Sequence, residues 1–594
     1  MCFSVINPFR RDFVYLIYIR KKKMKKSLFI VAALLCAVLV LGCGPRGTQA
    51  ARGPSQMDGR VKGTLPLSDG SVTFSVFLGG LDNFVTSFEY EDNLTTRMFT
   101  DETGINFNFV ASSRTDATTR ANVLLSSGDH PEIMIPSGFP RTFMTYYAAE
   151  GLLAPMELAH VLEWPRIRAL IEQYPFIVDV ITWSDGTVRG LPNVNDCTHC
   201  VDDAGRMFFY MPWLRENNIP EPTTMAELIS YLRFVRDNDM NRNGNRNDEV
   251  PWAWISTMQQ RAIAVFANMH MPFIVTRAGT FGLAMENGRL VEQYKDPRFR
   301  ETLRVMNQLY NEGLIIPENF TMNNEQIIAL VEGRDPLVAT VTTGHIMSVT
   351  YGTGQRRVDF NLGQVVSGPG GRYGSNIEPW SVANVNYFIT DKCQDVDLAI
   401  AFHDYLLRME STLAAYVGVK GDGWDDPDPG ALGINGQPAL YKYLVLWRGP
   451  DHRVNMGWNQ IGNKGQTTQF RLGEQALGFD IVREWMATGN PALRDTILAN
   501  PSYFETHNHI SLEHRMPYWK SVDFFIPIIN FNDADNTRLA DINASLNAFV
   551  DQACAQYIIG TRNINSDADW NQFIQELDRQ GALDRVAIYN RYLQ

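Results

Sequence analysis

The sequence is poor in cysteine, and this scarcity excludes several kinds of protein. Only seven cysteines occur in 594 residues. Three of them lie near the N-terminus: Cys2, Cys36 and Cys43. The others are Cys197, Cys200, Cys393 and Cys554. These are too few for a scaffold held together by disulfides, and a chain of this length can bury a core large enough to do without them.

Cys197 and Cys200 form a single C-x-x-C pair. A structural zinc site would need a second pair at suitable spacing, and the sequence has none. No strand-helix pattern of the thioredoxin kind surrounds the pair. We interpret it as a local disulfide or as idle thiols, with metal binding and redox function as the less favoured alternatives.

Positive charge is also in short supply. The chain has 53 Lys and Arg against 65 Asp and Glu, a net charge of -12. This balance argues against nucleic acid and against an anionic membrane surface as partners, but it allows a neutral ligand. The composition, 45% hydrophobic and 11% aromatic, is that of a globular protein, and the length predicts more than one domain.

Motifs of common enzymes are missing as well. The sequence contains no P-loop, no serine nucleophile elbow and no H-E-x-x-H zinc motif. Paired carboxylates of a glycosidase kind cannot be judged from sequence, because 65 acidic residues always supply a pair somewhere. We therefore predict a protein that is not an enzyme.

What the sequence does have is an export signal. Basic residues follow Met24, an apolar stretch covers residues 28–41, and Gly42-Cys43 ends it. The stretch is shorter than the roughly 20 residues of a membrane span, so it indicates a secretory signal. The small residue before Cys43 resembles a bacterial lipobox, which predicts cleavage and acylation (palmitate) at that cysteine. The alternatives are an uncleaved signal anchor or a plain secreted protein.

We therefore treat residues 1–43 as a signal peptide region with its true start at Met24. Residues 44–70, rich in Gly, Ser, Pro and Arg, predict a flexible tether. The mature chain is expected to be exported and membrane-anchored, at the cell surface or a periplasmic face.

The body shows the pattern of an α/β domain. Alternation predicts a strand over residues 72–77, followed by a helical stretch and a second strand over residues 106–110. Another helix ends near residue 129, and a strand follows at residues 131–135. Further along, Thr224 and Glu227 form a capping box at the start of a helix.

The C-terminal region predicts two helices. Apolar residues recur at helical spacing from Leu539 to Tyr557, and Gly560 ends the pattern. A second helix is capped at residues 566–569, carries Trp570 on its apolar face and ends at Gly581. We expect Trp570 to lie in the core.

Several segments resemble the extracellular solute-binding proteins of bacterial ABC importers, in particular the LplA-type oligosaccharide-binding lipoproteins. Residues 124–133 are similar to the family's SGDxPDI stretch, and residues 185–192 to its DGKxYGLP stretch. Residues 213–228, 311–318 and 558–581 add further similarity. Each piece is weak alone, but their order behind a lipobox is specific.

The resemblance implies an α/β fold of the two-lobed periplasmic-binding-protein kind (type II, Venus-flytrap), with multiple crossings between the lobes. Lobe 1 would comprise residues 71–190 and about 385–470, and lobe 2 residues 191–384 and about 471–594. The first crossing would lie near residues 191–193 and the second near residues 382–390, just before a helix at residues 395–407. A monomer would hold an oligosaccharide in the cleft and deliver it to the permease subunits.

Residues 239–249 form the sharpest chemical motif in the chain. Oxygen-bearing side chains alternate, and Gly244 permits the turn that lets them wrap a hard cation such as Ca²⁺. The candidate ligands are Asp239, Asn241, Asn243, Asn245, Asp248 and Glu249. The resemblance implies calcium, since some members of the family, including alginate-binding proteins, bind it in a similar loop.

This loop departs from the family pattern in two ways. Its acidic pair comes one residue later, and only three of its side-chain ligands are carboxylates. The alternative is an asparagine-rich turn that caps the preceding helix without any ion.

A sugar receptor needs aromatic plates for the apolar faces of the sugar and fixed groups for its hydroxyls. Several aromatic residues lie in loop-like, polar stretches: Trp254, Trp380, Trp424, Tyr518 and Trp519. For each of them burial in the core is the alternative to ligand contact.

Two other functions compete with the receptor. The first is a surface glycoside hydrolase or polysaccharide lyase, and the second is an adhesin or scaffold without a small ligand. The sequence does not determine which sugar, peptide or other solute is bound, because selectivity depends on a few contacts.

Overall fold

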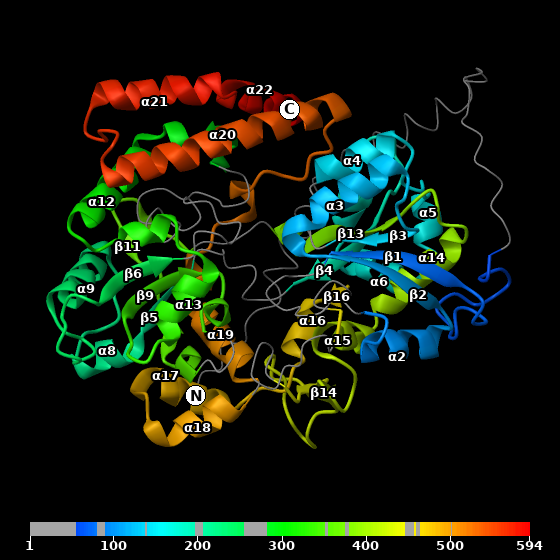
Figure 1. Ribbon diagram of the computed structural model, residues 1–594, viewed down its shortest axis with the longest axis horizontal. Helices are drawn as coiled ribbons and strands as arrows, with labels where there is room; N and C mark the ends of the chain where they lie inside the picture. Colours follow the sequence, from blue (N-terminus) through cyan, green and yellow to red (C-terminus); the bar gives the residue numbers. More distant parts are fainter. Residues whose placement is uncertain are drawn as a thin grey trace. The chain divides into compact units, whose positions relative to one another are not determined.

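The structure is a computed structural model (Figure 1). It describes residues 55–79, 90–136, 139, 141–196, 206–254, 282–350, 355–374, 379–445, 457–458, 464–500 and 502–593. The signal region with Met24 and Cys43, and the Cys197–Cys200 pair, lie outside these residues. None of the helices among these residues combines the length and the apolar character that a membrane span requires.

The first part of the fold is a six-stranded sheet with the order β16-β4-β13-β3-β1-β2. Strand β1 is parallel to β2 and β3, β13 is antiparallel to β3 and β4, and β16 is parallel to β4. The strands are β1 (Thr73–Gly79), β2 (Asn106–Ser112), β3 (Ile133–Ile135), β4 (Leu191–Asn195), β13 (Ala383–Ile389) and β16 (Gly465–Gln466).

Apolar side chains that alternate along these strands pack against helices. Phe77, Met134 and Phe388 come from three neighbouring strands and join one buried cluster. Leu125 of α3 and Met144 of α4 belong to the same cluster; Figure 1 shows both helices on one side of the sheet. The helices in this stretch of the chain are α2 (Leu94–Thr103), α3 (Arg114–Ser127), α4 (Arg141–Ala149), α5 (Leu158–Val161), α6 (Pro165–Gln173), α7 (Ile177–Ile181), α14 (Val396–Leu406), α15 (Met409–Val417) and α16 (Thr468–Leu472).

The second part is a four-stranded sheet with the order β10-β5-β9-β6. Strand β5 is antiparallel to β10 and β9, and β6 is parallel to β9. The strands are β5 (Arg206–Tyr210), β6 (Val250–Trp254), β9 (Val338–Thr343) and β10 (Phe360–Leu362). Every residue of β5, β6 and β9 is buried, which is expected of strands covered on both faces.

Helices from distant parts of the chain share the core of this sheet. Leu232 of α9, Leu303 of α12, Val341 of β9 and Leu546 of α20 belong to one buried cluster. The helices are α8 (Met211–Glu216), α9 (Met225–Asp237), α12 (Pro297–Asn311), α13 (Asn324–Glu332), α17 (Phe479–Thr488), α18 (Pro491–Ala499) and α19 (Tyr503–Glu513). Short strand pairs are β7 (Leu283–Glu286) with β8 (Arg289–Glu292), β11 (Ser367–Gly368) with β12 (Gly371–Arg372), and β14 (Trp424–Asp425) with β15 (Lys442–Tyr443).

The chain ends in three helices, α20 (Asp533–Ile559), α21 (Asp567–Arg579) and α22 (Ala582–Leu593). Helix α20 contacts α12, α21 and α22. Arg585 of α22 is fully buried and pairs with Glu292 of β8, which anchors the C-terminal helix to the β7–β8 hairpin.

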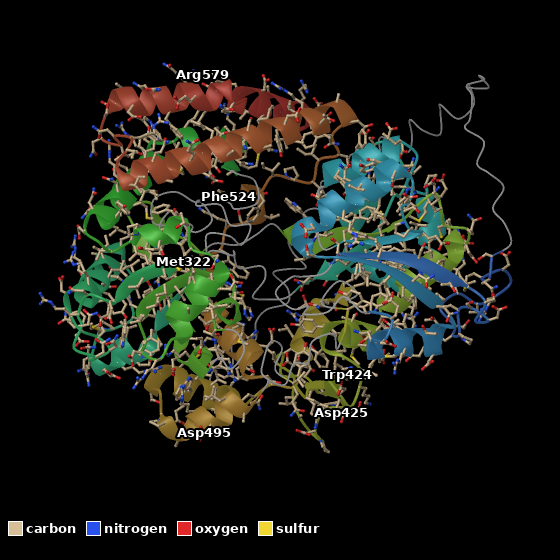
Figure 2. All side chains as sticks on the ribbon, viewed as in Figure 1. Met322, Trp424, Asp425, Asp495, Phe524 and Arg579 are labelled. Carbon is tan, nitrogen blue, oxygen red and sulfur yellow. The ribbon has the colours of Figure 1, made fainter. Side chains whose placement is uncertain are left out.

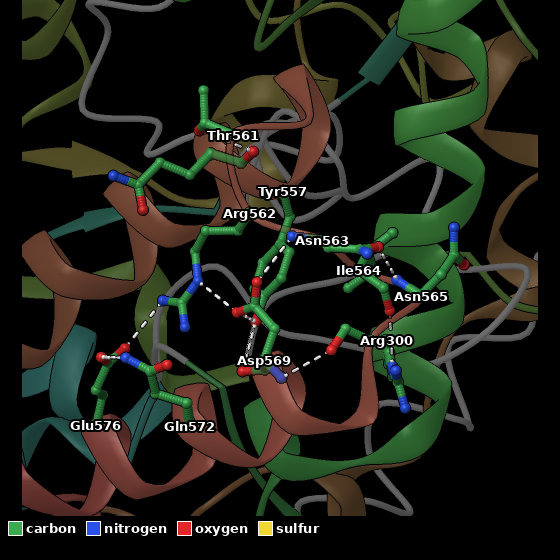
Figure 3. Close-up of polar contacts among 12 residues, drawn as sticks. Arg300, Tyr557, Thr561, Arg562, Asn563, Ile564, Asn565, Asp569, Gln572 and Glu576 are labelled. Carbon is green, nitrogen blue, oxygen red and sulfur yellow. Dashed lines mark hydrogen bonds and ion pairs between the residues drawn. The ribbon is translucent and has the colours of Figure 1, made fainter.

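A network of charged side chains fixes the turn between α20 and α21 (Figure 3). Arg562 donates through Nε to Asp569 Oδ1 at 3.0 Å and through Nη1 to Glu576 Oε2 at 2.9 Å. The Asn563 amide donates to Asp569 Oδ2 at 2.8 Å, and the Tyr557 hydroxyl donates to Asp569 Oδ1 at 3.0 Å. One carboxylate therefore ties together the end of one helix and the start of the next.

Local signals predicted several of these elements correctly. The predicted strands correspond to β1, β2 and β3, and the capping box at Thr224 begins α9 with both reciprocal hydrogen bonds. Gly560 caps α20, Ser566 caps α21, and Trp570 is buried, all as predicted.

The second half of the predicted flexible tether differs from the prediction. Residues 55–70 pack onto the body: Met57 and Leu67 are buried, and Ser55 Oγ donates to Asp395 Oδ1 at 2.7 Å. The same carboxylate caps α14, since its Oδ1 accepts the Leu398 amide at 2.9 Å. Two isolated apolar residues show no period in the sequence, so only the fold reveals that they are anchored.

Candidate functional site

The loop of residues 239–249 connects the end of α9 to the start of β6. Its side-chain oxygens accept hydrogen bonds from the loop's own backbone. Asp239 Oδ1 accepts the Asn243 amide at 3.1 Å and Asp239 Oδ2 the Gly244 amide at 2.9 Å. Asn243 Oδ1 accepts the Asn245 amide at 2.7 Å. The chain thus coils around its own oxygens, with Gly244 at a φ of 90° that favours glycine.

The two acidic residues at the end of the loop each leave one oxygen unsatisfied. Asp248 Oδ2 accepts from Asn243 Nδ2 at 2.7 Å, and Glu249 Oε1 accepts the Met240 amide at 2.7 Å. Asp248 Oδ1 and Glu249 Oε2 are buried and accept no hydrogen bond. Burial raises the pKa of the Glu249 carboxyl above its ordinary value.

These donors fit a hard cation by their chemistry, since carboxylate and amide oxygens are the ligands that Ca²⁺ prefers. Within the described residues, however, no three acidic, histidine or cysteine side chains stand close enough together to hold a metal. Carboxylates alone therefore do not form a cage here. An ion in this loop would need the oxygens of Asn241, Asn243 and Asn245 as well.

Two of the five aromatic candidates are buried. Trp254 is 2% exposed and packs edge-on against Trp252 and Phe320, with ring centroids 5.1 Å and 5.6 Å apart. Trp424, labelled in Figure 2, is 3% exposed and lies in a cluster with Leu413 and Tyr441. In this conformation neither ring offers a face to a ligand, which matches the core alternative for both.

The other three candidates are half-buried. Trp380 lies on the short helix η6 (Pro379–Val382), immediately before β13. Tyr518 ends the short helix η7 (Met516–Tyr518), and Trp519 follows it. The structure brings Tyr518 and Trp519 against residues 372–374 but does not bring Trp254 or Trp424 to the same place.

Tyr518 and its neighbours interlock with the end of β12 and the two residues that follow it. The Arg372 guanidinium lies 4.3 Å from the centroid of the Tyr518 ring, and Lys520 Nζ lies 3.7 Å from that of Tyr373. The Gly374 amide donates to the Tyr518 carbonyl at 2.8 Å. Each segment therefore places a cation on an aromatic ring of the other. We call residues 372–374 and 518–520 the cation–aromatic layer.

A cavity of about 420 Å³ lies beside this layer. Three separate stretches line it, namely residues 285–298, 370–373 and 520–524, and the second and third are next to or part of the layer. Its side chains include Glu286, Arg298, Tyr373, Lys520, Asp523 and Phe524; Phe524 is labelled in Figure 2. Sequence reasoning missed this site, although Lys520 directly follows two predicted residues.

A second cavity of about 370 Å³ lies between α20 and α21. Gln552, Gln556, Arg562 and Glu576 line it. Arg562 and Glu576 in its wall are already engaged in the turn network.

The comparisons with known proteins agree with the resemblance seen in the sequence. The chain matches no protein-family model. It is 21% identical over 593 residues to the fructooligosaccharide ABC transporter substrate-binding protein FusA of Streptococcus pneumoniae, covering 96% of this chain and 98% of FusA.

Solved structures show the same fold. FusA in complex with kestose has a TM-score of 0.67 at 19% identity, over 88% of this chain and 98% of FusA. An HMO-binding, ABC-transporter-associated solute-binding protein of Bifidobacterium longum infantis has a TM-score of 0.65 at 18% identity, over 88% of this chain and 99% of that protein. The alginate-binding protein AlgQ2 without calcium has a TM-score of 0.63 at 17% identity, over 89% and 98%. The predicted α/β, two-lobed solute-binding fold is confirmed.

Proposed function

We propose that this chain is the extracellular solute-binding protein of an ABC importer, and that it captures an oligosaccharide and delivers it to the permease without chemical change. The observation that carries the proposal is the fold match over nearly the whole length of proteins that bind oligosaccharides. The curated relative of almost equal coverage is a transporter component of the same kind. These comparisons support a receptor rather than the hydrolase or lyase alternative.

The physical basis is a shift between open and closed forms. A ligand that contacts both lobes binds the closed form better, and this difference in affinity is what shifts the equilibrium. The proposal divides the chain into lobe 1, residues 71–190 and about 385–470, and lobe 2, residues 191–384 and about 471–594. The six-stranded sheet draws its strands from residues 73–195 and 383–466, and the four-stranded sheet draws its strands from residues 206–362, which supports the division but places β4 with lobe 1 and the first crossing after residue 195.

The sugar would contact Trp380, Tyr518 and Trp519, the predicted aromatic residues that keep exposed surface. Trp254 and Trp424 would contact it only if their surroundings opened. The mature protein would be a monomer, exported and held to a membrane by acylated Cys43.

Calcium in residues 239–249 is the second part of the proposal. A structure of FusA carries an EF-hand mutation, and one of AlgQ2 was determined without calcium ion, so related proteins are associated with such sites. In this chain, Asp239, Asn241, Asn243, Asn245, Asp248 and Glu249 would supply the oxygens. The ion would stiffen the connection between α9 and β6 and would take no part in a reaction.

The proposal is tested with the purified mature protein and a panel of neutral oligosaccharides: kestose, nystose, maltotriose, cellotriose and raffinose. Isothermal titration should give saturable binding of at least one sugar with one site per chain. Chromatography of the same mixtures after a day should return the sugar unchanged. Cleavage products of a sugar would establish the hydrolase alternative. If the protein binds none of these sugars, the proposal of a receptor fails.

A further inference from the structure

The cavity beside the cation–aromatic layer has the size of a ligand-binding site. Its volume of about 420 Å³ lies within the range of about 300–1,000 Å³ usual for ligand pockets. Tyr373 and Phe524 contribute aromatic surface, and Ser521 and Asn287 add a hydroxyl and an amide. Such a wall can contact both the apolar faces and the hydroxyl rim of a sugar.

The cavity is lined by equal numbers of acidic and basic side chains. Glu286 and Asp523 are acidic, and Arg298 and Lys520 are basic. Arg298 Nη2 lies 3.2 Å from Glu286 Oε1, so one pair is already joined. Electrostatic complementarity favours a ligand without net charge, because an anion or a cation would meet both attraction and repulsion. Sugar hydroxyls, which both donate and accept hydrogen bonds, suit carboxylates and ammonium groups side by side.

The wall of the cavity is held in place by its neighbours. Lys520 Nζ lies 3.7 Å from the centroid of the Tyr373 ring and 5.5 Å from that of Phe524, so one cation orders two aromatic side chains. A β-carbon at Gly374 would come within 2.9 Å of Trp519 Cδ1. This close approach lets the two segments interlock and fixes the position of Lys520. Burial lowers the pKa of Lys520, which agrees with its place inside the wall.

The segment that lines the cavity is also connected to the other sheet. Residues 520–524 lead into α20, which contacts α4 beside the six-stranded sheet. Asp533, the first residue of α20, accepts a hydrogen bond from Ser184 Oγ at 3.3 Å. Residues 520–524 therefore lie on the chain segment that connects the cavity to the helix in contact with the first part of the fold.

We infer that this cavity is a subsite for one uncharged sugar unit of the transported oligosaccharide, held by Glu286, Lys520 and Asp523 against Tyr373 and Phe524. The inference rests on the proposed function, since it assigns a part of the same ligand to a place that the predicted aromatic residues do not reach.

The test fills the cavity. Ser521 is exposed and lines it, so Ser521→Trp adds bulk without removing a core contact. Gln552→Trp fills the second cavity, between α20 and α21, and is the matched control because Gln552 is also exposed. Both variants and the wild type are titrated with the oligosaccharide panel named above, after circular dichroism has shown native helix content.

Ser521→Trp should weaken binding of the sugar at least tenfold, and Gln552→Trp should leave its Kd within twofold. If the wild type binds a sugar and Ser521→Trp binds it equally well, the subsite is refuted while the proposed function stands. If the wild type binds no sugar, the proposed function fails and the subsite fails with it.

A second variant covers the case in which Ser521→Trp does not fold. Glu286→Gln keeps the shape of the side chain but replaces a charged acceptor by a neutral amide. This substitution should weaken binding of the sugar severalfold, and addition of salt should not restore binding. An unchanged Kd for Glu286→Gln would count against the subsite in the same way.

Discussion

The loop of residues 239–249 and the cavity at residues 520–524 are built in opposite ways. In the loop, every candidate ligand comes from one continuous stretch, and the hydrogen bonds within it join residues two to nine positions apart. In the cavity, the wall comes from three stretches of the chain that meet only in the folded protein. The loop is therefore a local structure, and the cavity depends on tertiary packing.

This difference indicates where a substitution can change one function while the fold is kept. Asp239 is satisfied by backbone amides of its own loop, so its replacement disturbs a short segment. The cavity shares Lys520 and Tyr373 with the layer that supports it, so its inner residues cannot be removed without loss of packing. Exposed Ser521 is the place to test the cavity, and Asp239 is the place to test the loop.

The largest expected effect is the stabilisation of the loop by calcium. If the ion binds the folded state alone, calcium at one hundred times its Kd should raise the free energy of unfolding by about 2.7 kcal/mol. Denaturant unfolding of the wild type in calcium and in EDTA measures this difference. Asp239→Asn should abolish it.

Asp237→Asn is the matched control, because Asp237 is exposed, pairs with Arg236 and lies just before the loop. It should keep the full calcium effect. Equal stability of the wild type in calcium and EDTA would favour the asparagine-rich turn without an ion.

The second effect is the loss of sugar affinity on filling the cavity, expected to be tenfold or more, which corresponds to about 1.4 kcal/mol. Each variant is also measured in the other assay. Ser521→Trp should lose sugar affinity and keep the calcium effect, whereas Asp239→Asn should lose the calcium effect and keep sugar affinity. Loss of both properties in either variant would show that loop and cavity form one coupled unit.

The third effect is a pH dependence of the loop. The pKa of Glu249 is raised by burial above its ordinary 4.5. Between that value and the raised one, the folded chain holds a proton that the unfolded chain has released. Stability in EDTA should therefore fall as pH rises through this window, by at most about 1.4 kcal/mol per pH unit.

Calcium should reverse this trend, because it binds the carboxylate and not the acid. The stabilisation by calcium should grow as pH rises from 4.5 toward 7. Glu249→Gln removes the titrating group, and its unfolding in EDTA should lose this part of the slope. A wild-type calcium effect that does not change with pH would exclude Glu249 as a ligand.

The smallest effect concerns the cation–aromatic layer. The Arg372 guanidinium lies 4.3 Å from the centroid of the Tyr518 ring, a contact worth about 0.5–1 kcal/mol when partly exposed. Tyr518→Phe keeps the ring and should leave stability unchanged, whereas Tyr518→Leu should lose that amount. Thermal unfolding of the two variants distinguishes the contribution of the ring from that of the hydroxyl. If both variants are equally stable, the contact between Arg372 and the ring does not stabilise the protein.

The sequence predicted those features that depend on neighbours in the chain. Caps and alternation located β1, β2, β3, α9, α20 and α21, because each signal lies within a few residues. The α/β, two-lobed fold came from the resemblance and is confirmed by the solved structures. The candidate loop was visible for the same reason, since its oxygens are consecutive.

Features that depend on distant segments were not predictable. Trp254 and Trp424 lie in polar stretches of sequence, yet they are buried by Phe320 and by Tyr441, which come from other parts of the chain. Met57 and Leu67 are anchored although their stretch has a linker's composition. Glu286 and Phe524 line one cavity although more than two hundred residues separate them.

Titration calorimetry of the mature protein with the neutral oligosaccharide panel, followed by chromatography of the recovered sugar, tests the central claim most directly. We expect saturable binding of at least one oligosaccharide at one site per chain, with the sugar recovered intact. Cleavage of the sugar, or the absence of binding across the panel, would contradict it.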